Sequence, residues 1–242
     1  MRKTLRLIAL GATAALTLSG CQKIDDQAFG QKVRAYLLEH PEVIQEAVEK
    51  LQAKQQAAAA KAAQDGISKY RKELVADSRD FVANPNGSIT VVEFFDYRCG
   101  YCKLAAPEVL KLIKENPDVR FVFKEFPIFG DASDLAAQVV LSPAAKPKSL
   151  ELYGRFMAEK ALDEAAIDRI LTEVGVDPAA AKAGGSTPAV QKQIADVRQL
   201  AQDLMIEGTP AFVVGDTMIS GADIGALKRA IAEARAKTIK PA

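Results

Sequence analysis

The chain has 242 residues, of which 49% are hydrophobic and 26% are charged, so we expect a mostly folded protein and not a disordered one. Its 32 basic and 31 acidic residues leave a net charge of +1, which argues against a nucleic-acid surface. Three cysteines exclude a disulfide-rich scaffold. The single histidine, His40, excludes most histidine-built zinc sites and any catalytic triad that needs a second imidazole.

The N-terminus predicts an export signal over residues 1–20. Three basic residues within positions 1–6 precede an apolar run at 7–18 that is too short to span a bilayer. The sequence Leu-Ser-Gly-Cys that follows resembles a bacterial lipobox, in which Cys21 receives diacylglycerol and becomes the new N-terminus. An ordinary signal peptide that leaves Cys21 as a free thiol is the alternative.

The lipobox predicts a place for the mature protein. We expect it on the periplasmic side of the bacterial cell envelope, anchored by acyl chains. The residue after Cys21 is Gln22, and not the aspartate that resembles an inner-membrane retention signal. This favours the outer membrane over the inner one.

Residues 21–79 predict a helical arm. Alanine, glutamine, lysine and glutamate dominate it, and apolar residues recur at helical spacing up to Glu39 and again after Pro41. The second helix carries one apolar stripe, close to a seven-residue repeat, that comprises Ile44, Ala47, Val48, Leu51, Gln55, Ala58 and Ala62. The stripe predicts an oligomerisation stalk that also spaces the next domain from the membrane. A helix packed along its own domain, or an Ala/Gln-rich spacer, is the alternative.

A second domain is predicted for residues 80–242. The segment 77–88 contains Pro85 and the turn pair Asn86-Gly87, which places the boundary there. His40, before a proline at a helix junction, is assigned no chemistry.

The chemistry of the sequence lies at a Cys-x-x-Cys motif. The apolar run Ile89–Phe95 is typical of a buried central strand and is interrupted only by Glu93. The motif Cys99-Gly100-Tyr101-Cys102 follows, and a helical pattern comes after it. Cys99 would then lie at a helix N-terminus, where free N–H groups favour the thiolate, with Cys102 one turn later within disulfide reach. We interpret Cys99 as the nucleophile and Cys102 as the resolving thiol.

Two other readings of the motif are weaker. A zinc site would need two more ligands, and Cys21 and His40 are the only other cysteine and histidine, both before the boundary. A purely structural disulfide would close almost no loop and would contribute little stability. We therefore predict a thiol–disulfide exchange site with no metal and no cofactor.

Three motifs together resemble the DsbA family of exported thioredoxin-fold proteins over roughly residues 80–236. They are FFDYRCGYC, the Phe126-Pro127-Ile128 turn after a second apolar strand at 119–126, and the run GTPAFVV with Gly221 beyond it. The segment LLEHPEVIQEAVEKLQ is similar to the N-terminal segment of the ScsC-like branch, in which such segments are associated with oligomerisation. The resemblance implies an α/β thioredoxin fold with a DsbA-like helical insertion, preceded here by the helical arm.

The resemblance also implies roles for single residues. Pro210 would be a cis-proline beside the active disulfide, and the backbone of Thr209 would pair with a substrate strand. Glu93, six residues before Cys99, would be a buried acid beneath the disulfide. Burial should raise its pKa, so that it can exchange the proton of Cys102; a solvent-facing glutamate is the alternative.

Two tyrosines near the motif, Tyr97 and Tyr101, are interpreted as contact surface for peptide, with ordinary packing as the alternative.

The dipeptide between the cysteines bears on the direction of the reaction. In the strongly oxidising members of the DsbA family, the motif resembles Cys-Pro-His-Cys, whose histidine stabilises the thiolate. Here Gly100-Tyr101 supplies no cation and looks like the dipeptide of the exported isomerases. Thr209 before Pro210 also looks like those isomerases. The pair should therefore be a weaker oxidant, although Arg98 could restore some stabilisation of the thiolate.

The rest of the chain fits this architecture. Helical patterns fill an insertion at about 131–207, a hairpin is expected across Asp216-Thr217, and Asp223 should cap a last helix. No nucleotide fingerprint occurs.

The sequence thus predicts a lipid-anchored exchanger that favours isomerisation or reduction. Its partners would be unfolded or misbonded exported proteins, a membrane thiol–disulfide redox partner and further copies of itself, and no nucleic acid. The alternatives are a monomeric oxidase recharged by a membrane partner, and an anchored chaperone or copper-binding protein that holds Cu(I) on the two thiols.

Overall fold

The computed structural model describes residues 26–239 of the chain. The predicted signal peptide and the predicted lipidation site, Cys21, lie outside the described residues. Within the described part, no helix combines the length and the apolar character needed to cross a membrane.

Two helices form the N-terminal segment. Helix α1 spans Asp26–Glu39 and α2 spans Glu42–Lys69, with Pro41 immediately before α2. No other described residue covers the apolar stripe of α2, since Ile44, Val48 and Leu51 are 53%, 47% and 55% exposed.

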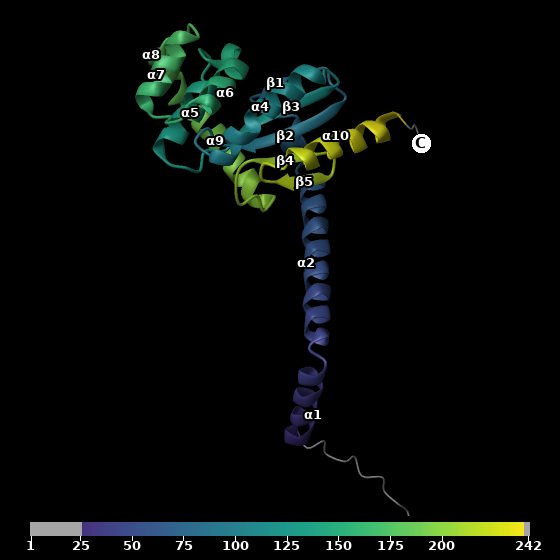
Figure 1. Cartoon of the computed structure of the whole chain (residues 1–242). Coiled ribbons are helices and arrows are strands. Elements are labelled where there is room, and N and C mark those ends of the chain that lie inside the picture. The colour runs from purple at the N-terminus through teal and green to yellow at the C-terminus, as the bar shows by residue number, and fades with distance from the viewer. Residues whose placement is uncertain (1–25, 240–242) are drawn as a thin grey trace, which may run out of the picture. The chain divides into compact units, whose positions relative to one another are not determined.

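Five strands form one mixed sheet in the order β1-β3-β2-β4-β5 (Figure 1). The strands are β1 (Phe81–Ala83), β2 (Ile89–Phe95), β3 (Val119–Glu125), β4 (Ala211–Val214) and β5 (Thr217–Ser220). Strands β2 and β3 are parallel, and the other neighbouring pairs are antiparallel. The strand predicted at Ile89–Phe95 and the predicted hairpin are confirmed, whereas β1 lies in a segment for which we expected only turns.

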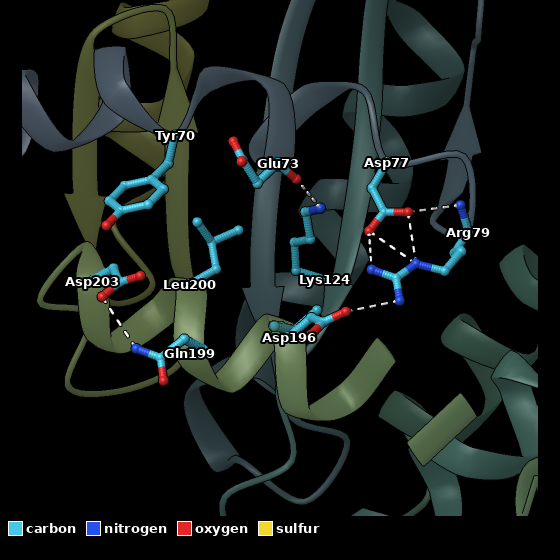
Figure 2. Close-up of a pocket in the computed structure, with 10 residues that line it drawn as sticks. Tyr70, Glu73, Asp77, Arg79, Lys124, Asp196, Gln199, Leu200 and Asp203 are labelled. Atoms are coloured by element: carbon cyan, nitrogen blue, oxygen red, sulfur yellow. Dashed lines mark hydrogen bonds and ion pairs between the residues drawn. The ribbon is translucent and has the colours of Figure 1, made fainter. Parts of the chain in front are cut away.

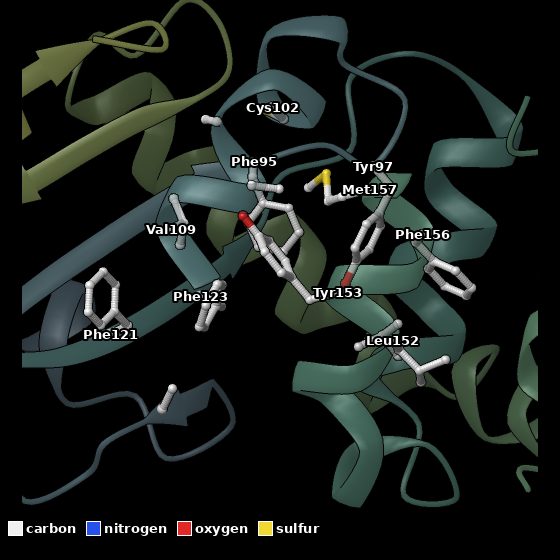
Figure 3. Packing of buried hydrophobic residues seen from close by; sticks show 14 of the residues in the cluster. Phe95, Tyr97, Cys102, Val109, Phe121, Phe123, Leu152, Tyr153, Phe156 and Met157 are labelled. Atoms are coloured by element: carbon white, nitrogen blue, oxygen red, sulfur yellow. The ribbon is translucent and has the colours of Figure 1, made fainter. Parts of the chain in front are cut away.

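Helices cover both faces of the sheet. One face packs against α4 (Gly100–Glu115), α10 (Ile224–Ile239) and inserted helices, and the aromatic part of this core is shown in Figure 3. The other face packs against the end of α2, α3 (Arg71–Val75) and α9 (Pro188–Asp203). Side chains on β2 alternate between these faces, so Glu93 points to the α4 side.

The core opposite α4 begins before residue 80. Ile67 and Leu74 are buried and pack with Val92 of the central strand. The last turn of α2 and all of α3 are therefore needed to cover the sheet.

Five helices occupy the connection between β3 and β4: α5 (Asp131–Leu141), α6 (Ser149–Ala158), α7 (Glu164–Glu173), α8 (Pro178–Gly185) and α9, with a short 3-10 turn before α6. Helix α8 lies within the helical insertion expected at about 131–207 and ends in two glycines, Gly184 and Gly185. A Cβ on Gly185 would lie 2.5 Å from the carbonyl oxygen of Gln138 in α5. The glycine thus serves close packing of α8 on α5 and not a turn.

Candidate active site

The two cysteines occupy the junction of β2 and α4. Cys99 is the N-cap of α4, and Cys102 lies in the first turn of that helix. Both are free thiols; Cys99 is 3% exposed and Cys102 is fully buried. This is the strand, Cys-x-x-Cys, helix arrangement that the sequence predicted.

Hydrogen bonds favour the thiolate form of Cys99. The strongest is donated by the Cys102 thiol, and others come from the Thr209 side chain and from the backbone N–H groups of Cys102 and Tyr101. Together they outweigh burial and lower the pKa of Cys99 to about 5. Cys99 is therefore ionised at neutral pH, as a nucleophile in disulfide exchange must be.

The environment of Cys102 has the opposite effect. Burial raises the pKa of the Cys102 thiol well above its usual value, and the hydrogen bond to Cys99 and the charge of Glu93 raise it further. The two sulfurs are thus differentiated: one is a ready nucleophile, and the other needs help to lose its proton.

A distant segment completes the site at Cys99. The Thr209–Pro210 peptide bond is cis, in agreement with the expectation from the resemblance. The Cys99 thiol donates to the carbonyl oxygen of Thr209 at 3.1 Å. Among the described residues, the buried Thr209 hydroxyl has no hydrogen-bond partner other than the Cys99 sulfur, to which it can donate once Cys99 is ionised.

Glu93 is buried beneath the cysteines and is not solvent-facing. Its side chain is 1% exposed, and the hydroxyl of Tyr153 in α6 donates to either carboxyl oxygen, at 3.1 and 3.2 Å. Burial raises the pKa of Glu93 to about 8, although the Tyr153 hydrogen bond lowers it. Glu93 therefore carries a proton at pH 7 and titrates close to the physiological range.

A second buried acid was missed by the sequence analysis. Glu125 of β3 points to the same face of the sheet as Glu93, and the Tyr97 hydroxyl donates to its Oε1 at 2.7 Å. Burial raises the pKa of Glu125 well above its usual range. The signal was present, since Glu125 lies within the apolar strand predicted at 119–126 just as Glu93 lies within the one predicted at Ile89–Phe95.

Tyr97 corrects one sequence expectation. We interpreted it as contact surface for peptide, but it is buried in the aromatic cluster with Phe95 and Phe156. Tyr97 lies on the turn between β2 and α4, and its hydroxyl can reach Glu125 because the ring points into the core (Figure 3). Tyr101, by contrast, is 66% exposed at the start of α4.

Asp96 organises the turn that carries Cys99. Its buried carboxylate accepts hydrogen bonds from the Arg98 and Ile128 backbone amides at 2.7 Å, from the Ser133 hydroxyl at 2.8 Å and from the Phe129 amide at 3.1 Å. The Arg98 guanidinium also donates to the Phe129 carbonyl at 2.7 Å. These bonds fix the turn against the loop after β3, which keeps Cys99 at the end of α4.

A family comparison agrees with this geometry. Residues 90–232, more than half of the chain, match the family described as DSBA-like thioredoxin domain. The chain belongs to the DSBA-like thioredoxin family. Residues 25–58 match a second family, described as the N-terminal domain of the copper resistance protein ScsC.

Known proteins resemble this DSBA-like chain over most of its length. The thiol:disulfide interchange protein DsbA of Bordetella pertussis is 31% identical over 59% of this chain and 73% of its own. Among solved structures, Proteus mirabilis ScsC in a transitional conformation is 30% identical with a TM-score of 0.66, over 88% of this chain and 97% of its own. BcfH of Salmonella enterica Typhimurium is 34% identical with a TM-score of 0.71, over 87% and 96%.

These matches confirm the predicted fold and the ScsC-like resemblance. The protein is a DSBA-like thiol–disulfide oxidoreductase with an N-terminal helical region.

Another hollow in this DSBA-like domain is not a competing site. It has a volume of about 230 Å³ and lies between the end of the arm and α9, on the opposite face of the sheet from Glu93 (Figure 2). Its cations are all paired: Arg79 pairs with Asp77 and Asp196, and Lys124 donates to the Glu73 carbonyl oxygen at 2.6 Å and pairs with the buried Asp80. Such internal pairing supports the fold and leaves little free charge for a ligand.

Proposed function

We propose that this protein catalyses thiol–disulfide exchange on exported proteins in the bacterial cell envelope, and that it favours isomerisation and reduction over oxidation. The observation that carries the proposal is a Cys99 thiolate held beside the Thr209–Pro210 peptide bond. A thiolate present at neutral pH is the species that attacks a misplaced disulfide.

The exchange proceeds in two balanced steps. The Cys99 thiolate attacks one sulfur of the substrate disulfide, forming a mixed disulfide and releasing the other substrate sulfur as a thiolate. Cys102 then loses its proton and attacks Cys99, which releases the second substrate thiol. The protein dithiol is oxidised by two electrons and the substrate disulfide is reduced by two. Isomerisation occurs when a different substrate thiolate attacks the substrate sulfur of the mixed disulfide first, which forms a new substrate disulfide and releases the Cys99 thiolate. A membrane redox partner would reset the cysteine pair.

The oxidase remains the alternative function because the same low pKa of Cys99 favours the reduced protein, which makes its disulfide more oxidising. The absence of a cation between Cys99 and Cys102 supports the weaker oxidant. The deciding measurement compares two rates. Refolding of scrambled ribonuclease needs an isomerase, and oxidation of reduced ribonuclease needs an oxidase.

The arm is proposed to assemble several copies of the chain. The exposed stripe on α2 would be buried in such an assembly, which would also shield the active sites from the oxidase of the membrane.

We predict that Val48→Gln with Leu51→Gln, in a full-length protein that carries Cys21→Ser, gives a monomer. It should keep dithiol reductase activity but, in the presence of the membrane oxidase, lose most isomerase activity on scrambled ribonuclease, because its active sites are no longer shielded from that oxidase. Light scattering at micromolar concentration measures the assembly. Substitution is preferable to deleting residues 22–76, since that deletion would remove Ile67 and Leu74 from the core.

The matched control for the arm is Glu46→Gln with Glu49→Gln, on the face of α2 opposite the stripe, which should leave assembly and activity unchanged. A parent protein that is already monomeric would make the arm a spacer only. Equal isomerase activity in the monomeric variant would separate assembly from the chemistry.

Lipid anchoring at Cys21 is proposed from the lipobox, with the outer membrane favoured. Cys21→Ser should move the protein from the membrane fraction to the soluble periplasmic fraction, as checked by fractionation and by the mass of the N-terminal peptide. Wild-type protein that is soluble and has an unmodified Cys21 thiol would contradict the assignment.

A further inference from the structure

A hollow beside the nucleophile collects positive charge. It has a volume of about 310 Å³ and is lined by Arg98, Lys103 and residues 160–163, which connect α6 to α7. Arg98 directly precedes Cys99, and the backbone amide of Lys103 donates to the Cys99 carbonyl oxygen at 3.0 Å. Two residues that line the hollow are thus joined to the backbone of the reacting cysteine, one by sequence and one by a hydrogen bond.

Three cations line the hollow without a carboxylate partner among the described residues. The Arg98 guanidinium and the Lys103 ammonium donate to backbone carbonyls, of Phe129 and Glu159 respectively, and Lys160 forms no ion pair. Burial lowers the pKa of Lys103, and repulsion from Arg98 acts in the same direction, whereas the charges of Glu159 and Asp96 raise it. Most other cations of this domain, by contrast, are neutralised by a neighbouring acid.

The acids near the hollow are already engaged. Asp163 lines it, but its Oδ1 accepts from the Ala166 amide at 2.8 Å as the N-cap of α7. The Glu159 carboxylate pairs with Arg169, and the buried Asp96 carboxylate holds four hydrogen bonds. Three cations against one lining carboxylate leave an excess of positive charge beside Cys99.

We propose that this hollow is a subsite for a carboxylate that the substrate carries next to its reacting sulfur. The inference rests on the proposed exchange reaction at Cys99. Arg98 offers a planar fork that matches a carboxylate, and the two lysines add point charges. An acidic side chain beside a substrate cysteine and a carboxylate of a small thiol such as glutathione share this chemistry.

The test uses disulfide-linked peptide dimers that differ in one residue beside the cysteine, which is Glu, Gln or Lys. We measure the rate at which reduced protein cleaves each dimer at low salt. The Glu dimer should react about threefold faster than the Gln dimer, and the Lys dimer should react more slowly, since an exposed ion pair contributes about 0.2–1 kcal/mol. The Glu preference should shrink as salt is added.

Three variants test whether the residues of the hollow cause the preference for the Glu dimer. Lys160→Gln, an exposed change, should reduce the ratio of Glu to Gln rates, and Arg98→Gln with Lys160→Gln should bring it close to one. Lys160→Glu should favour the Lys dimer instead. The matched control is Lys114→Gln, in the last turn of α4 and about 20 Å from Cys99 along that helix, which should leave every ratio unchanged.

The outcomes separate the subsite from the exchange function. Equal rates for the three dimers together with no preference for oxidised glutathione over hydroxyethyl disulfide, or a Glu preference that survives in the double variant, would overturn the subsite. Failure to cleave even the Gln dimer would overturn the exchange function, and the subsite with it. Oxidised glutathione against neutral hydroxyethyl disulfide tells the two carboxylate sources apart: a preference confined to glutathione assigns the hollow to small thiols, and one confined to the peptides assigns it to protein substrates.

Discussion

Cys99→Ser is expected to lower the rate of insulin disulfide reduction to the uncatalysed rate. In Cys102→Ser, by contrast, mixed disulfides between the protein and its substrate should accumulate. With a pKa of about 5, roughly 99% of Cys99 is thiolate at pH 7, while the raised pKa of Cys102 leaves almost none of it ionised. Removing Cys99 removes the nucleophile. Removing Cys102 leaves the first step intact and blocks release.

The roles can be checked directly by alkylation. Iodoacetamide should modify Cys99 rapidly at pH 6 and leave Cys102 unmodified in the folded protein. Cys102→Ala should raise the pKa of Cys99, because the strongest hydrogen bond to its thiolate is lost, and Cys102→Ser should raise it less, because a hydroxyl can still donate. If Cys102 is the sulfur that reacts first, the two roles are reversed.

Local patterns were enough to place the reacting sulfurs. The apolar run of β2, the helix pattern of α4 and the spacing of Cys99 and Cys102 all concern neighbouring residues, and each has one clear periodicity. The hairpin after Pro210 and the Asp223 cap, which accepts from the Ala226 amide at 2.8 Å, are equally local. Strand β1 has three residues, too few to show any period.

Contacts between distant segments could not be predicted in the same way. Tyr153 meets Glu93 across 60 residues, and the contact exists only because α6 packs on the face of the sheet to which Glu93 points. The sequence alone did not decide whether Tyr97 is buried or exposed, because its partner Glu125 lies on the next strand. Asp96 contacts the loop after β3, and no residue spacing in the sequence predicts that contact.

The titration of Glu93 should make the stability of the protein depend strongly on pH. The folded pKa of about 8 lies above the ordinary value of 4.5, because burial disfavours the charged form. Between pH 4.5 and 8 the folded state keeps a proton that the unfolded state has released. The folded protein therefore loses stability as pH rises through this window, by about 1.4 kcal/mol per pH unit.

Glu93→Gln should remove this loss. The amide oxygen can still accept from Tyr153, so the variant should match the reduced wild type below pH 4.5 and exceed its stability by on the order of 4 kcal/mol near pH 8. Denaturation followed by circular dichroism measures the difference, since the chain has no tryptophan for fluorescence. A difference that does not change with pH would place the folded pKa of Glu93 near its ordinary value.

The same variant tests the role of Glu93 in the reaction. Release of substrate from the mixed disulfide requires Cys102 to lose a proton, and ionised Glu93 is the base placed to accept it. In the wild type, release should accelerate as pH rises towards 8, and in Glu93→Gln it should be slower and lose this dependence. Glu125→Gln is the matched control: it should also be more stable than the wild type at high pH, because Glu125 is buried with a raised pKa, but it should show a normal release profile. An unchanged release rate for Glu93→Gln across pH 6–9 would make Glu93 a structural residue, since its proton would then play no part in the chemistry of Cys102.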